Sequence, residues 1–125
     1  MDKSQALHSF WSSFGLTAYD EASIPSGDNA PPFPYISYTV ATDALGAAIP
    51  LSASLWYKST SWREITLKAE EIAQSIEQME KPIPLDVGYL WIVRGNPFAQ
   101  RMSEPGDNTI RRILLNIMVE YLTPY

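Results

Sequence analysis

The chain contains no cysteine and only one histidine among its 125 residues. The absence of cysteine excludes disulfides, thiolate metal sites and cysteine nucleophiles. A zinc site of the usual kind cannot be built with one histidine, so any metal would need carboxylate ligands. A Ser-His-Asp triad would have to use His8, on a predicted helix that also supplies core residues. We therefore expect a solvated His8, no metal, no cofactor and no enzymatic activity.

Phosphate-binding motifs and long apolar runs are missing as well. Neither G-x-x-x-x-G-K nor G-x-G-x-x-G occurs, so no motif favours nucleotide binding. No apolar run approaches the roughly 20 residues of a membrane-spanning helix, and the first residues lack the apolar segment of a signal peptide. These absences predict a cytoplasmic protein with no membrane partner.

Positive charge is scarce, since nine Lys and Arg residues stand against fourteen Asp and Glu residues and the net charge is −5. Sequence-independent binding of nucleic acid depends on clustered basic side chains. The composition therefore argues against a protein that binds nucleic acid in this way.

The length is sufficient for one domain and too short for two, so residues 1–125 are expected to form a single domain. Near its start, apolar residues recur at helical spacing and predict a helix over residues 4–14, ended by Gly15. Residues 20–34 contain four prolines and predict a loop, which a short strand over 16–19 could precede.

The segment PPFPYISYTV, residues 31–40, has two interpretations. Its prolines are compatible with a PxxP ligand for another domain. The alternation that follows them favours a strand over residues 35–41, with the prolines stiffening its approach. A turn over 44–50 and a second strand over 51–58 would complete an antiparallel hairpin.

The second half of the chain predicts a helix and another pair of strands. Residues 61–79 carry an apolar helical stripe, and Ser61 and Glu64 have the spacing of a capping box. Strands are expected over 88–94 and 110–122, joined by a long loop over residues 95–108. The predicted fold is α+β, with two helices on one face of an antiparallel sheet of about four strands, in the order α-β-β-α-β-β.

The last predicted strand is apolar on both faces. Leu115, Ile117 and Val119 alternate with Leu114 and Met118. Because the helices can cover only one face of the sheet, the other face needs a second cover. Oligomerisation would supply that cover, and a second layer within the chain is the alternative.

Arginines and large apolar residues gather around the loop over residues 95–108. The expected interface residues there are Arg94, Phe98, Arg101, Met102, Arg111 and Arg112. Arginine, aromatic and Met side chains are typical of hot spots at protein–protein interfaces. In the alternative interpretation the arginines pair with Glu104 and Asp107, and Phe98 packs beneath its own loop.

The whole pattern resembles the tail terminator, or tail-completion, proteins of long-tailed bacteriophages. The resemblance covers nearly the full chain in order and length: an N-terminal helix, a proline-interrupted entry to a strand (FPYISYTV), a second strand (SASLWYKS), an amphipathic helix (SWREITLKAEEIAQSI) and a last strand with arginines at its start (NTIRRILLNIMVEYLT). No short signature within it is diagnostic by itself.

This resemblance implies a virion structural protein that forms a homo-oligomeric, hexameric ring. Such a ring caps the tail-tube protein, stops tail polymerisation and presents a surface to head-completion or connector proteins. Closing the ring requires complementary patches on each subunit, which the arginine-bearing loop and an acidic helix face with Glu70, Glu71 and Glu77 would supply. DNA would pass through it without specific binding. The subunit would be found in the host cytoplasm during assembly and at the head-proximal end of the tail in the virion.

A second class of protein is compatible with the composition. A secretion chaperone is also a short, acidic α+β binding module, and it acts as a dimer that holds an unfolded segment of its client. The mass of the assembly separates this class from the ring.

Overall fold

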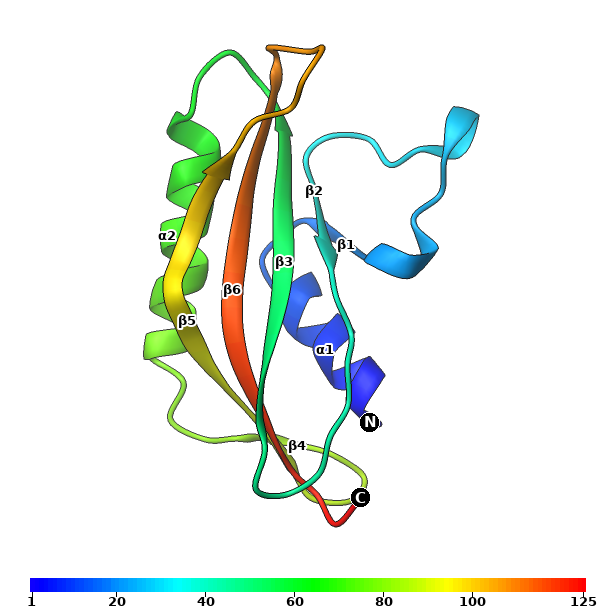
Figure 1. Ribbon diagram of the computed structural model, residues 1–125, viewed down its shortest axis with the longest axis vertical. Helices are drawn as coiled ribbons and strands as arrows, with labels where there is room; N and C mark the ends of the chain where they lie inside the picture. Colours follow the sequence, from blue (N-terminus) through cyan, green and yellow to red (C-terminus); the bar gives the residue numbers. More distant parts are fainter.

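A computed structural model describes all residues, 1–125, as an open six-stranded sheet with two helices (Figure 1). The strands are β1 (Thr17–Asp20), β2 (Tyr35–Tyr38), β3 (Ala48–Lys58), β4 (Ile83–Pro84), β5 (Tyr89–Met102) and β6 (Ile110–Leu122). The helices are α1 (Lys3–Ser12) and α2 (Arg63–Glu77), and two short 3-10 turns lie at Glu21–Ser23 and Gly27–Asn29.

The prediction of a four-stranded antiparallel sheet is wrong. The sheet is mixed, with the strand order β1-β2-β3-β6-β5-β4, and it curls into a half-barrel. β1 and β2 run parallel, whereas every other neighbouring pair is antiparallel. The order α-β-β-α-β-β therefore lacks two strands, β1 and β4. β4 has only two residues, which is too short for a period of two to stand out in the sequence. β1 lies within one residue of the short strand considered over 16–19, which was left out of that order.

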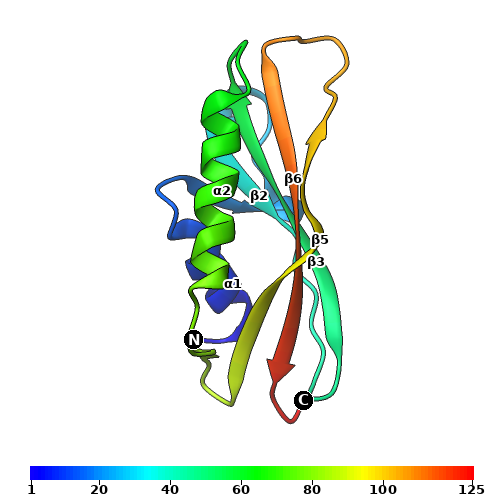
Figure 2. The same cartoon turned by 90° about the vertical axis from the view of Figure 1, so that its left-hand side faces the viewer.

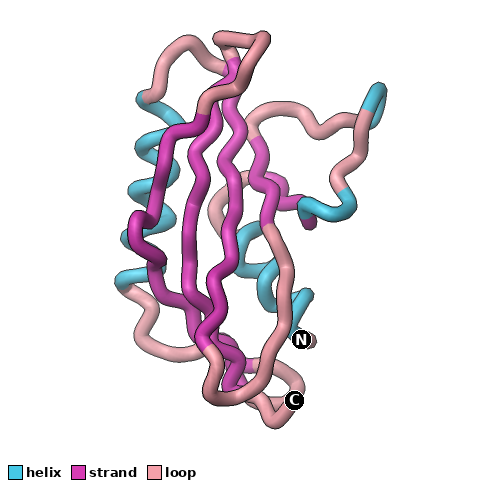
Figure 3. Tube along the Cα trace, viewed as in Figure 1, coloured by secondary structure: helices cyan, strands magenta, loops and turns pink.

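The long loop predicted over residues 95–108 is also wrong. β5 continues to Met102, and only residues 103–109 connect it to β6, whose bounds agree with the prediction (Figure 3). The β5–β6 ladder shifts register between Arg94 and Ala99, where Pro97 and its neighbours form a bulge. A bulge accommodates a proline without ending the strand, because β6 offers partners along its whole length.

The first hairpin agrees with expectation, since β2 and β3 are antiparallel. β3 begins at Ala48, three residues before the predicted start, because it pairs with β6 from Ala48 to Lys58. β2 ends at Tyr38, and beyond it the Thr39 hydroxyl donates to the Ser52 carbonyl oxygen at 3.0 Å. The segment PPFPYISYTV thus enters the sheet as a strand.

The helix caps differ from those predicted. α1 begins with a capping box in which Asp2 accepts from the Gln5 backbone N–H and the Gln5 side chain accepts from the Asp2 backbone N–H. α2 has no side-chain cap of this kind, because Ser61 Oγ accepts from the Arg63 backbone N–H instead. The predicted Ser61–Glu64 box is therefore wrong, although the helix itself is present.

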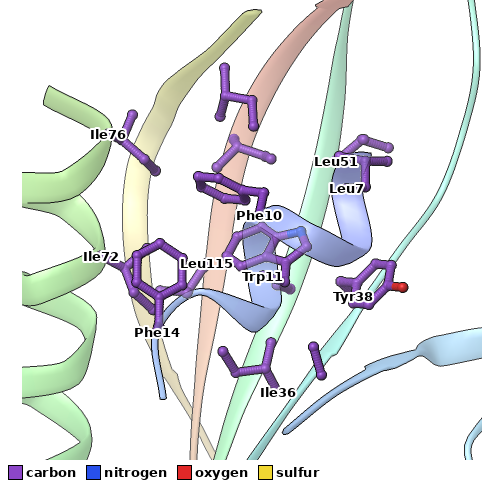
Figure 4. Packing of buried hydrophobic residues seen from close by; sticks show 14 of the residues in the cluster. Leu7, Phe10, Trp11, Phe14, Ile36, Tyr38, Leu51, Ile72, Ile76 and Leu115 are labelled. Atoms are coloured by element: carbon purple, nitrogen blue, oxygen red, sulfur yellow. The ribbon is translucent and has the colours of Figure 1, made fainter. Parts of the chain in front are cut away.

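Both helices lie on the same side of the sheet, and the opposite side carries no element (Figure 2). Twenty-three buried residues fill the space between helices and sheet. Side chains from α1, α2 and the strands point into this common space (Figure 4). α2 contributes Ile65, Ala69, Ile72 and Ile76. The core is thus single and one-sided, which leaves the outer face of the sheet to be explained.

Candidate protein–protein interface

Two of the predicted arginines converge on a tryptophan at the start of α2. The guanidinium of Arg101 lies 4.8 Å from the centre of the Trp62 ring, and that of Arg111 lies 5.1 Å from it. These distances are within the range of cation–π attraction. We call Trp62, Arg101 and Arg111 the arginine–tryptophan cluster.

The cluster has no acidic partner in the chain. Neither Arg101 nor Arg111 forms an ion pair, and Arg111 Nη2 donates only to the Thr60 carbonyl oxygen, at 2.9 Å. Arg111 Nε is buried without a hydrogen-bond partner. An exposed arginine over a tryptophan, lacking a carboxylate, is well suited to receive an acidic group from another molecule.

Arg112 faces the other side of the sheet and is satisfied internally. Its guanidinium lies 4.9 Å from the Trp56 ring centre, its Nε donates to Ser54 Oγ at 3.0 Å, and it pairs with Glu104 at 3.7 Å. Trp56 in turn stacks on Tyr35, with ring centres 6.0 Å apart. The alternative of internal pairing therefore describes Arg112.

Two of the four acidic residues of α2 find partners within the chain. Glu77 pairs with Arg94 at 2.7 Å, and Glu71 pairs with Lys68 at 3.3 Å. Glu77 and Arg94 were expected on the facing surfaces of two subunits, but they lie side by side in one. The α2 carboxylates and the arginines of β5 consequently do not form patches on opposite sides of the molecule.

Phe98 lies in the bulge of β5 and packs against the core, rather than beneath a loop as the internal alternative expected. It lines a groove of about 260 Å³ between α2 and β5, together with Ala69, Glu70, Ala73 and Arg101. Thr66 also lines this groove, and its buried hydroxyl has no hydrogen-bond partner. Met102, at the end of β5, is half-buried beside the arginine–tryptophan cluster.

The side of the sheet opposite the helices carries apolar side chains on β3, β6 and β5, interspersed with polar ones such as Asn116 and Glu120. Val93 lies opposite Met118, which in turn lies opposite Pro50. Val93 is 41% exposed and Tyr89 is 49% exposed. We define the bare sheet face by its apolar residues Pro50, Tyr89, Trp91, Val93, Leu114, Met118 and Leu122. No second layer of this chain covers it, which leaves oligomerisation, of the two covers considered, as the open prediction.

Sequence reasoning missed Trp62 and the β5 part of the bare sheet face. Trp62 lies at the start of α2, as the predicted helix over 61–79 implied, but no local pattern indicates that two arginines from β5 and β6 lie over its ring. Tyr89, Trp91 and Val93 alternate with the buried Leu90 and Ile92, and this alternation in YLWIV is the signal that could have found them.

No three His, Cys, Asp or Glu side chains gather closely enough to hold a metal ion. His8 is exposed, with Nδ1 lying 3.0 Å from the Tyr38 hydroxyl. Hydrogen bonds from Thr109 lower the pKa of Asp107, which orders the turn before β6. No helix has both the length and the apolar composition needed to cross a bilayer.

Comparison with known proteins adds no relative: no protein-family model matches the chain, and the search of curated proteins finds no match.

Proposed function

We propose that this protein is a virion structural subunit that assembles into a hexameric ring and terminates a bacteriophage tail tube. The observation that carries the proposal is the bare sheet face, which is apolar and has no cover within the chain. The resemblance of the sequence to tail terminator proteins supplies the kind of assembly. In this role the protein is not an enzyme.

Energetics favour a partner on the bare sheet face. Burial of apolar surface contributes about 2.5 kcal/mol for each 100 Å² removed from water. Four side chains of this face, Leu114, Met118, Leu122 and Trp91, are already half-buried, so they are held in place before any partner arrives. A preordered apolar surface loses little conformational entropy on association.

The charge of the chain suits the proposed ring. DNA would pass through the lumen without specific binding, and a net charge of −5 disfavours retention of phosphate. The other partners would be the tail-tube protein on one side and a head-completion or connector protein on the other. The subunit would act in the host cytoplasm during assembly and remain at the head-proximal end of the tail.

The test is the mass of the assembly, by size-exclusion chromatography with light scattering at rising concentration, together with electron microscopy of purified tail tubes. We expect hexamers and capped tube ends. Val93→Asp should stay folded but should no longer cap tube ends, because it places a charge on the bare sheet face. Leu45→Asp is the matched control in an exposed loop, where Leu45 is 69% exposed, and it should assemble normally.

The same measurement tests the arginine–tryptophan cluster. Arg101→Glu should weaken assembly, since Arg101 has no ion-pair partner to lose within the chain. Lys81→Glu makes the same change of charge at an exposed site and should not weaken it. A wild-type chain that stays monomeric and never decorates tube ends would refute the proposal. A dimer that co-purifies with an extended client segment would identify a secretion chaperone instead.

A further inference from the structure

The open sheet has two edges without partner strands. β4 pairs only with Tyr89 and Leu90, so the outer edge of β5 is free from Trp91 to Met102. At the other end of the sheet, β1 pairs only with β2. A free edge presents unpaired backbone N–H and C=O groups that can accept another strand.

We infer that these two edges pair between neighbouring copies of this chain. β1 of one subunit would add to the Ala99–Met102 segment of the next, and the sheet would continue from subunit to subunit. This inference rests on the proposed ring and identifies the surfaces that close it.

Strand directions are compatible with this pairing. β1 runs parallel to β2, and three antiparallel pairs then lead through β3 and β6 to β5. β1 is therefore antiparallel to β5 within one subunit. A rotation about an axis along the strands preserves these directions, so β1 would meet the next β5 in the more stable antiparallel arrangement. Because the two edges differ, the contact is heterologous and can generate a ring.

The two segments also match in length and in the side chains they present. Ala99–Met102 follows the bulge and contains no proline, and it has the same four-residue length as β1. On the helix-covered face of the sheet, the Ala99–Met102 segment presents Ala99 and Arg101, which lie opposite the buried Leu115 and Ile113 of β6.

β1 presents Ala18 and Asp20 on the same face, opposite the buried Ile36 and Tyr38. If the two strands pair in antiparallel fashion with their helix-covered faces on the same side, two registers are possible. In one Asp20 lies opposite Ala99, and in the other it lies opposite Arg101. In either register Asp20 is a direct or diagonal cross-strand neighbour of Arg101.

Unpaired charges at both edges and a polar group beside β5 support pairing with a second copy of the chain. Arg101, Asp20 and the adjacent Glu21 form no ion pair within the chain. The groove beside Ala99–Met102 is lined in part by the small side chains of Ala69 and Ala73. The buried Thr66 hydroxyl in this groove has no partner, and a polar group of an incoming segment would satisfy it.

Cysteine cross-linking tests the inference directly, because the chain has no cysteine of its own. Tyr19 and Gln100 lie on the uncovered side of the sheet, as does Met102. The double variants Tyr19→Cys/Gln100→Cys and Tyr19→Cys/Met102→Cys cover the two registers. Within one chain the paired cysteines are about 19 Å apart, since three strands separate them, so a disulfide can form only between chains.

Mild oxidation of the assembled protein should give a ladder of covalently linked chains on denaturing gels, ending at the hexamer and lost on reduction. Tyr19→Cys/Leu45→Cys is the control and should give no ladder. The Gln100→Cys single variant should give no dimer either, and a dimer from it would show β5 pairing with β5 and overturn the inference. Circular dichroism of every variant confirms that it is folded.

The outcomes separate the two proposals. If hexamers form and neither double variant cross-links, the edge pairing is wrong and the proposed function stands. If the wild-type chain forms no ring, the proposed function fails, and the edge pairing fails with it.

Discussion

At the scale of single residues, Ile72 shows how strongly the core depends on one face of α2. Its side chain is 0% exposed and belongs to the core that α2 shares with the sheet. Ile72→Asp would bury a carboxylate without a partner, at a cost of several kcal/mol. Small domains are stable by only about 5–15 kcal/mol. We expect the variant to be unfolded at room temperature, as measured by circular dichroism and urea titration.

Leu67→Asp is the matched control for this prediction. Leu67 is on the same helix but is 50% exposed, so its replacement should change the free energy of unfolding by less than about 1 kcal/mol. A cooperative melt of Ile72→Asp at the wild-type temperature would show that the core face of α2 is assigned wrongly.

The sequence predicts this face well and the arginine surface poorly, for physical reasons. The stripe of Ile65, Ala69, Ile72 and Ile76 is buried as expected, because helical spacing alone places these side chains on one face. Adjacent residues of a strand point to opposite faces, so Arg111 and Arg112 could not share one surface. What each arginine meets depends on Trp62 and Trp56, which approach from distant parts of the chain.

At the scale of elements, local signals failed where tertiary pairing decides the outcome. Gly95, Asn96 and Pro97 are typical of a turn, yet the ladder with β6 carries β5 past them. β1 has four residues and joins the sheet only because β2 lies beside it. Longer elements with a clear period, β6 and α2, were placed correctly within two residues at each end.

Gly88, in the turn before β5, provides a prediction at this scale. Its φ is +88°, a conformation that favours glycine, and a Cβ added there would collide with the Leu122 carbonyl oxygen. Gly88→Ala must therefore strain the backbone and also push apart the ends of β5 and β6. We expect it to lower the free energy of unfolding by roughly 2–4 kcal/mol, measured by urea titration.

Gly106→Ala separates the two contributions. Gly106 has nearly the same φ, +90°, but no atom lies within 4 Å of the position its Cβ would occupy. Only the backbone strain remains, and a loss of about 1 kcal/mol is expected. Equal losses for the two variants would contradict the predicted contact between Gly88 and the end of β6.

At the scale of the whole molecule, the topology lay beyond sequence reasoning. The mixed half-barrel depends on a parallel β1–β2 pair separated by residues 21–34, and no local pattern specifies such a contact. The bare sheet face was foreseeable, because the alternation in β6 is apolar on both sides. Its occupant was not, since an apolar surface does not by itself identify what covers it.

Buried tyrosines also make the stability of the whole fold sensitive to alkaline pH. Burial raises the pKa of Tyr38 on β2, Tyr57 on β3 and Tyr121 on β6, and that of Tyr35 on the uncovered side of β2. Glu104 and Tyr19 raise the pKa of Tyr35 further. These tyrosines hold their protons to a higher pH in the folded chain than in the unfolded chain, whose tyrosines titrate near pH 10.

Between about pH 10 and the raised pKa values, the unfolded chain binds fewer protons than the folded chain, so stability falls as pH rises. We expect the melting temperature, measured by circular dichroism, to hold steady up to about pH 9 and then to decrease steeply. Tyr121 contributes because it is fully buried and its hydroxyl donates to the Ala41 carbonyl oxygen at 2.7 Å. Tyr121→Phe should lower stability at neutral pH by about 1 kcal/mol and flatten the alkaline decrease. If Tyr121→Phe loses stability at high pH as steeply as the wild type does, Tyr121 does not contribute to the alkaline decrease.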